Sequence, residues 1–81
     1  MNELEVRSKL EGIIRETFPA FRRPLSDSTT AKDVPGWDSV AHFNLIMKIE
    51  DEFRIELDAS ESYTLENIGQ LTRFVCAVLG I

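Results

Sequence analysis

Ser39 and His42 are the residues whose types and spacing could do chemistry, because side chains three positions apart on a helix share one face. Ser39 follows Asp38 where a stretch of apolar periodicity begins, so we expect its hydroxyl at an exposed helix start. Unpaired N–H groups at such a start stabilise an attached phosphate. The pair therefore permits either covalent attachment to the serine, or attack by the serine with the histidine as its base.

Catalysis at Ser39 lacks the other groups that a serine nucleophile needs. It requires an oriented base, an oxyanion hole and a pocket, but the chain has no second histidine and no glycine-rich elbow around the serine. Capping is the ordinary role of a helix-start serine, but Asp38 already supplies the cap. One histidine and one cysteine cannot build a metal site. We predict no catalytic residue and no metal ligand, and we interpret His42 as a surface residue beside Ser39.

Composition and charge restrict the class of protein. The chain of 81 residues is long enough for one domain, residues 1–81, with a modest core. Its net charge is −5, and the acid excess lies entirely in residues 38–81. The negative charge of that half disfavours binding to nucleic acid and to anionic lipid, and it favours binding to basic patches on protein partners. A single cysteine, no signal-peptide pattern and no long apolar run predict a protein of the cytosol, outside membranes. A monomer is the default expectation.

Hydrophobic spacing predicts helices and no strand. Four residues precede segments of helical apolar spacing and are predicted to be N-caps, three of them within capping boxes: Asn2, Asp38, Asp58 and Asn67. We therefore expect helices over residues 3–18 and 39–53, a short third helix ending near residue 65, and a last helix closed by Gly80. The connection over residues 19–38 is unusually long. Its apolar residues indicate that it packs across the bundle: Phe21, Leu25, Val34 and Trp37.

The second helix carries two apolar stripes. Leu45, Ile49 and Phe53 form one stripe, which is typical of a core face. A second stripe is rotated away from the first and is expected to be partly exposed, which indicates a partner as well as a core. Carboxylates near the C-terminal end of this helix are disfavoured by its dipole. They have two alternative explanations: they form an ordinary solvated face, or a basic partner recognises them. The predicted partner-binding residues are Val40, Phe43, Met47, Glu50 and Asp51.

These features resemble the acyl carrier protein family. The resemblance rests on residues 33–40, which read Asp-Val-Pro-Gly-Trp-Asp-Ser-Val, on the apolar and acidic positions of residues 45–53, and on residues 65–71. It covers nearly the whole chain in the family's order and at its length. An Asp-Ser-aliphatic triplet alone is a weak signal, but the triplet with this spacing is specific.

The resemblance implies an all-α, acyl-carrier-protein-like four-helix bundle, with three main helices, a short third helix and a long loop after the first. It implies that Ser39 carries 4′-phosphopantetheine, transferred from coenzyme A by a magnesium-dependent phosphopantetheinyl transferase, and that Asp38 belongs to the recognition motif. The terminal thiol would then carry acyl or aminoacyl thioesters. The implied partners are that transferase, an acyl- or aminoacyl-loading ligase, and downstream synthase or transferase enzymes.

The chain departs from fatty-acid carriers in the charge of its second helix. Those carriers usually have acids soon after the serine, whereas this chain has Ala41 and Asn44 there and Lys48 further along. The difference favours a specialised pathway, such as polyketide, nonribosomal peptide or small-acid biosynthesis, over housekeeping fatty-acid synthesis. The alternative from another class is an unmodified helical adaptor that binds one protein partner through the exposed stripe.

Overall fold

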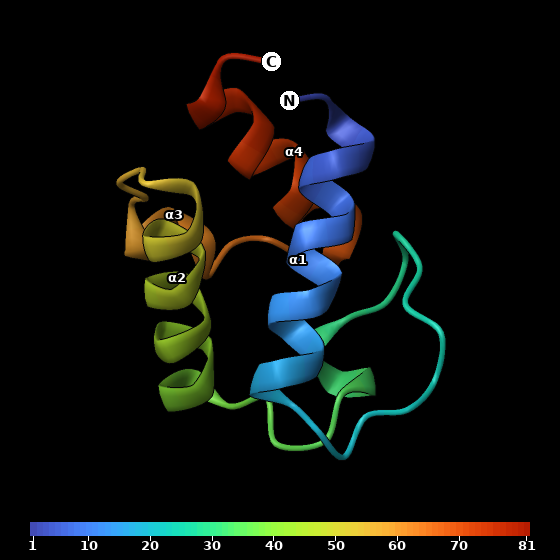
Figure 1. The fold of residues 1–81 in the computed structure, drawn as a ribbon. Helices are drawn as coiled ribbons and strands as arrows, with labels where there is room; N and C mark the ends of the chain where they lie inside the picture. The colour runs from blue at the N-terminus through green and yellow to red at the C-terminus, as the bar shows by residue number, and fades with distance from the viewer.

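Four α-helices and one 3₁₀ turn make up the fold in the computed structural model, which describes residues 1–81 (Figure 1). The helices are α1 (Glu3–Thr17), α2 (Ser39–Phe53), α3 (Ala59–Ser62) and α4 (Ile68–Leu79), and the 3₁₀ turn η1 spans Ala31–Asp33. The predicted all-α class is confirmed, with both termini at one end of the molecule. No helix combines the length and the apolar character that crossing a membrane requires.

The N-caps that the sequence predicts all form. The side chain of Asp38 accepts from the Ala41 N–H at 2.8 Å, and Asn2 forms the complete capping box with Glu5. At Asp58 and at Asn67 only the forward bond of the predicted box is present. At Asn67 the Gln70 side chain instead accepts from the N–H of Glu66. Gly80 closes α4 in the left-handed conformation, as predicted.

The third helix is shorter than predicted, since it ends at Ser62 and not near Leu65. Two hydroxyls bond backbone carbonyls in and beside its single turn: Ser62 Oγ donates to the Ala59 carbonyl at 2.6 Å, and Thr64 Oγ1 donates to the Glu61 carbonyl at 2.7 Å. Serine and threonine side chains compete in this way with backbone helical bonds. The chain therefore leaves the helix after one turn.

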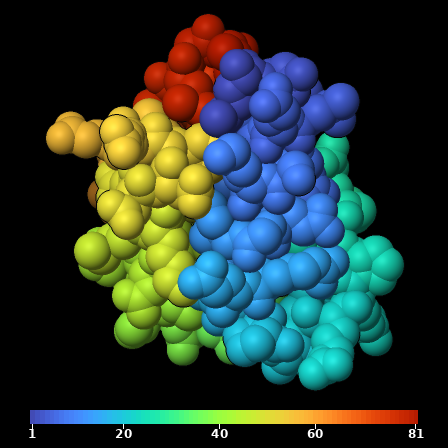
Figure 2. Space-filling model, viewed as in Figure 1, coloured from blue at the N-terminus to red at the C-terminus, as the bar shows by residue number.

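The core lies where α1 meets α2 and α4. Figure 1 shows α1 beside α2, with α4 crossing behind its upper part, and Figure 2 shows α1 packed without a gap against α2 and the loop around residues 20–30. Each long helix contributes a stripe at three- and four-residue spacing, as the hydrophobic pattern predicts. The residues that are at most 3% exposed include Val6, Leu10 and Ile14 of α1, Leu45, Ile46 and Ile49 of α2, and Ile68, Leu71 and Val75 of α4.

The long loop between α1 and α2 is fixed to the bundle, as its apolar residues predict. Phe21 and Val34 are buried. The loop backbone also accepts two N–H groups from the start of α4, Ile68 to the Thr29 carbonyl at 3.0 Å and Gly69 to the Asp27 carbonyl at 2.9 Å. Helix starts leave such N–H groups without intrahelical partners. The loop therefore completes α4 and is held in turn, which fixes the segment that leads to Ser39.

Candidate functional site

A tight turn at the end of the loop positions the start of α2. The Trp37 N–H donates to the Val34 carbonyl at 3.2 Å across Pro35 and Gly36. Gly36 has φ +87°, the left-handed value that the third position of a Pro-Gly turn requires. A Cβ there would meet only Phe18 at 4.0 Å, so the glycine is needed for its conformation and not for space. The turn directs Trp37 inward and leaves the next two residues at the surface.

Ser39 is the first residue of α2 and is exposed. The Asp38 side chain caps the Ala41 N–H, and the Asp38 carbonyl accepts from the His42 N–H at 2.8 Å. The N–H groups of Ser39 and Val40 precede the first intrahelical bond and face outward at the positive end of the helix dipole. A phosphate ester on the Ser39 hydroxyl would therefore lie in a favourable field, in the open, without displacing any packed side chain.

His42 does not lie at the surface, so that interpretation is wrong. Its ring is half-buried, and both nitrogens are bonded: Trp37 Nε1 lies 3.0 Å from Nδ1, and Ser62 Oγ lies 3.0 Å from Nε2. Burial lowers the pKa of His42, and a hydrogen bond with the Ser62 backbone opposes that shift. No hydrogen bond joins the ring to Ser39. Both ring nitrogens are thus directed toward Trp37 and Ser62 and not toward the Ser39 hydroxyl.

Aromatic side chains complete this contact between the loop end, α2 and α3. Trp37 stacks on Phe18 with ring centroids 4.9 Å apart, which confirms that it packs the loop end onto the bundle. Tyr63 lies against His42 at 4.5 Å, and its hydroxyl donates to the Ser39 carbonyl at 3.0 Å. No sequence pattern pointed to Ser62 or Tyr63, because a four-residue helix and the residue after it are too short to show a periodicity.

A pocket of about 270 Å³ lies beside Ser39. Leu65, Ile68 and Leu71, between α3 and the middle of α4, contribute apolar side chains to it, and Glu66 and Asn67 of the same segment contribute polar ones. The start of α2 and the residue after α3 line it with polar and aromatic side chains: Trp37, Asp38, Ser39, His42 and Tyr63. A flexible group attached to the serine would thus have an apolar space next to its point of attachment.

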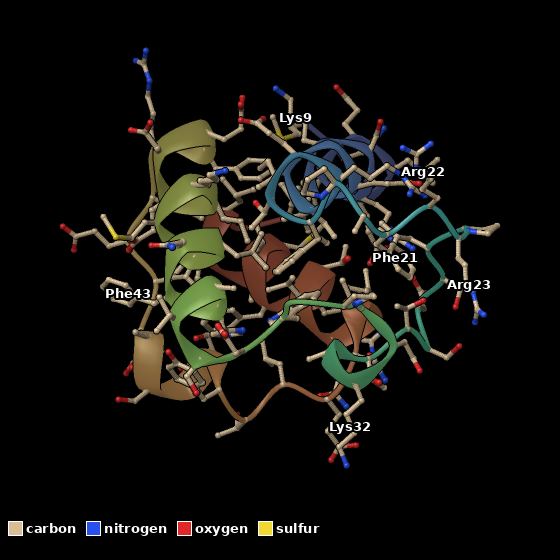
Figure 3. The ribbon with its side chains drawn as sticks, turned by 90° about the horizontal axis from the view of Figure 1, so that it is seen from below. Lys9, Phe21, Arg22, Arg23, Lys32 and Phe43 are labelled. Carbon is tan, nitrogen blue, oxygen red and sulfur yellow. The ribbon has the colours of Figure 1, made fainter.

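The second stripe of α2 is exposed, as predicted. Val40 is 72% exposed, Phe43 48% and Met47 52%. Figure 3 shows Phe43 pointing outward from α2, on the side away from the loop arginines Arg22 and Arg23. No acid occurs between Ser39 and Ile49 on this helix, and the one cation there, Lys48, lies 4.0 Å from Glu16. The exposed stripe that follows the serine is therefore apolar, and α2 carries no acid before Glu50.

The carboxylates at the end of α2 differ in their availability. Glu50 is half-buried, and its Oε2 accepts from the Leu57 N–H at 2.8 Å. Glu52 lies 3.5 Å from Lys9 of α1. Asp51 is exposed and forms neither kind of contact. Asp51 is thus the acid of the three that is most open to a partner.

Comparison with known proteins identifies relatives of the same size. The chain is 32% identical over 76 residues to an acyl carrier protein of Guillardia theta, and the match covers 93% of each chain. The solution structure of a holo acyl carrier protein from Geobacter metallireducens superposes with a TM-score of 0.82 at 32% identity, over 93% of this chain and 86% of that one. A non-reducing polyketide synthase of Didymella fabae is 25% identical over 80 residues, but the chain spans only 3% of its length. No family model matches the chain.

Proposed function

Because the chain belongs to the acyl carrier protein family, we propose that Ser39 is the residue that carries its 4′-phosphopantetheine. The observation that carries the proposal is the exposed serine at the first position of α2, next to the Asp38 cap. We further propose that a phosphopantetheinyl transferase recognises Asp38 together with the serine. The first turn of α2 then supplies a rigid and accessible acceptor.

The proposed modification forms one bond to the protein. The Ser39 oxygen attacks the pantetheine-linked phosphorus of coenzyme A, the phosphoanhydride bond breaks, and the nucleotide leaves while the hydroxyl gives up its proton. The N–H groups of Ser39 and Val40 stabilise the resulting phosphodiester, because they lie at the positive end of α2. When bound, the group supplies a terminal thiol that holds acyl or aminoacyl groups as thioesters.

The protein itself is proposed to be non-catalytic. Both nitrogens of His42 are engaged by Trp37 and Ser62, so no side chain activates the Ser39 hydroxyl from within. Its contribution is to hold a cargo on a flexible tether, which raises the effective concentration of that cargo at each partner enzyme. The chemistry of loading and transfer belongs to those partners, an acyl- or aminoacyl-loading ligase and downstream synthase or transferase enzymes.

The proposed docking surface is the exposed stripe of α2, Val40, Phe43 and Met47, with Asp51 at its far end. Glu50 belongs to the proposed surface as well, although one of its oxygens caps the chain at Leu57. Because the stripe is apolar and lacks acids over three turns, partners would bind it mainly by burying apolar area. Such docking depends little on ionic strength.

We propose a specialised pathway over housekeeping fatty-acid synthesis. Two observations support this: the uncharged surface that follows Ser39, and the similarity to a segment of a polyketide synthase. That the protein acts as a monomer in the cytosol remains a prediction from the sequence.

The test is intact mass before and after incubation with coenzyme A, magnesium and a broad-specificity phosphopantetheinyl transferase. The chain contains a matched control, because Asp27-Ser28 is a second exposed Asp-Ser pair that does not begin a helix. Wild type and Ser28→Ala should each gain one phosphopantetheine, and Ser39→Ala should gain none. If folded wild type gains nothing with several transferases, the unmodified helical adaptor becomes the better account.

A further inference from the structure

Tyr63, the residue that follows α3, joins that helix to the first turn of α2. Its hydroxyl donates to the Ser39 carbonyl at 3.0 Å, and its ring lies against His42 with centroids 4.5 Å apart. Ser39 and His42 are three positions apart on α2, so they share one face of the helix. The tyrosine side chain therefore lies along the first turn of α2 and contacts it at two points.

The hydroxyl contact is a restraint that Ser39 receives from nowhere else in the chain. It is the only hydrogen bond that reaches Ser39 from another element. A backbone carbonyl has two lone pairs, so it can accept from the tyrosine hydroxyl as well as from the N–H four residues later in the helix. The bond therefore adds a tertiary contact at the residue proposed for modification, without replacing a helical one.

The end of α3 is fixed independently of the tyrosine hydroxyl. The neighbouring Ser62 is fully buried, and its Oγ lies 3.0 Å from His42 Nε2 and donates to the Ala59 carbonyl at 2.6 Å. The N–H of Tyr63 itself donates to the Ser60 carbonyl at 3.3 Å. Because none of these bonds uses the phenol, α3 should keep its place when the phenol is removed. It is thus a fixed point from which Tyr63 restrains Ser39.

Tyr63 has little part in the core of the bundle. Its side chain is 50% exposed and lies outside the cluster of buried apolar residues. Together with Ser39 it lines the pocket at the start of α2. Removal of its hydroxyl should therefore affect the first turn of α2 and leave the packing of the long helices intact.

We propose that Tyr63 is a positioning residue for the modification of Ser39, because its hydroxyl bond to the Ser39 carbonyl keeps the first turn of α2 closed. The end turns of helices open most readily. A nucleophilic oxygen reacts efficiently only when it is held in the reacting geometry. The effect on modification rests on the function proposed for Ser39, whereas the restraint on the turn does not.

Amide exchange in the unmodified full chain, measured by NMR, tests the restraint. Tyr63→Phe keeps the ring beside His42 and removes only the hydroxyl. Exchange at residues 41–43, whose N–H groups form the bonds of the first turn, should become about two- to fivefold faster. Exchange in α4 and the melting temperature should stay close to those of wild type.

The matched control removes a hydroxyl at the next position. Thr64 Oγ1 donates to the Glu61 carbonyl of α3 at 2.7 Å and forms no bond to α2. Thr64→Val should therefore leave exchange at residues 41–43 unchanged. Tyr63→Ala removes both the hydroxyl and the ring, and it should speed exchange there at least as much as Tyr63→Phe does.

The kinetics of phosphopantetheine transfer separate positioning from docking and from stability. With the chain as the substrate of a broad-specificity transferase, Tyr63→Phe should lower kcat about two- to fivefold and change KM less than twofold. Met47→Gln, in the exposed stripe, should instead raise KM and leave kcat unchanged. A merely structural role of Tyr63 would lower the melting temperature without moving kcat.

Four outcomes would count against these expectations, each in its own way. Wild-type exchange in Tyr63→Phe would overturn the proposal, and so would an effect confined to Tyr63→Ala, because the ring and not the hydroxyl would then hold the turn. Faster exchange with an unchanged kcat would refute the link to modification. Absence of transfer to wild type and to every variant would instead refute the proposed function and leave the exchange result standing.

Discussion

Gly69→Ala tests how the loop that leads to Ser39 is held. Gly69 is buried at the start of α4, and its N–H donates to the Asp27 carbonyl at 2.9 Å. A Cβ at this position would lie 2.9 Å from Asp27 Cβ and 3.2 Å from the Asp27 carbonyl oxygen. Carbon atoms in contact normally lie about 3.5–4.0 Å apart. The loop backbone must therefore move away from α4.

The cost can be worked from these contacts. Overpacking of this kind costs about 1–3 kcal/mol, and the two loop bonds, to Ile68 and Gly69, contribute about 1 kcal/mol each where they are lost. Alanine recovers at most about 1 kcal/mol through its better helix propensity. We expect a net loss near the middle of the resulting range, about 2 kcal/mol, which lowers the melting temperature by roughly 8–16 °C in a domain of this size.

Gly12→Ala is the matched control, since the same substitution should there have the opposite sign. Gly12 is exposed in the middle of α1, and a Cβ would meet nothing within 4 Å. Alanine should stabilise the protein by about 0.5–1 kcal/mol. Urea and thermal unfolding of both variants measure the two effects. Equal responses, or a Gly69→Ala variant as stable as wild type, would refute the account of how the loop is fixed.

Three further predictions concern pH, docking and thiol chemistry. Because burial lowers the pKa of His42, the unfolded chain binds more protons than the folded chain at mildly acidic pH. The resulting stabilisation is complete above the ordinary pKa of 6.5 and is lost as the pH falls toward the pKa of the folded protein. Urea titrations at several pH values should show this dependence in wild type and not in His42→Gln. Phe43→Gln and Met47→Gln should change stability by no more than about 0.5 kcal/mol yet weaken transferase binding, and wild-type affinity should vary little with salt. Burial raises the pKa of the Cys76 thiol, so the folded unmodified chain should react slowly with a disulfide reagent, while the modified chain should gain one fast-reacting thiol.

The helices and their ends could be predicted from the sequence because their determinants are local. The caps at Asp38 and Asn67 and the terminating Gly80 act within one turn of the residues that they serve, and the apolar spacing alone distinguishes the two stripes of α2. The exposed position of Ser39 follows from the same signals.

The surroundings of the serine could not be predicted, because they depend on residues far apart in the chain. His42 bonds Ser62, 20 positions later, and Tyr63 bonds the backbone of Ser39, 24 positions earlier. The loop is attached to α4 through the backbone carbonyls of Asp27 and Thr29, which carry no side-chain signal. Reading His42 as a surface residue failed for this reason, since its burial comes from α3 and the loop.

The most direct test of the central claim is to locate the group by peptide mapping after reaction with coenzyme A and a transferase. Trypsin should release residues 33–48 between Lys32 and Lys48, and Ser39 is the only serine or threonine in that peptide. The account predicts one phosphopantetheine on this peptide and on no other. A group on the peptide that contains Ser28, or none on folded protein, would contradict it.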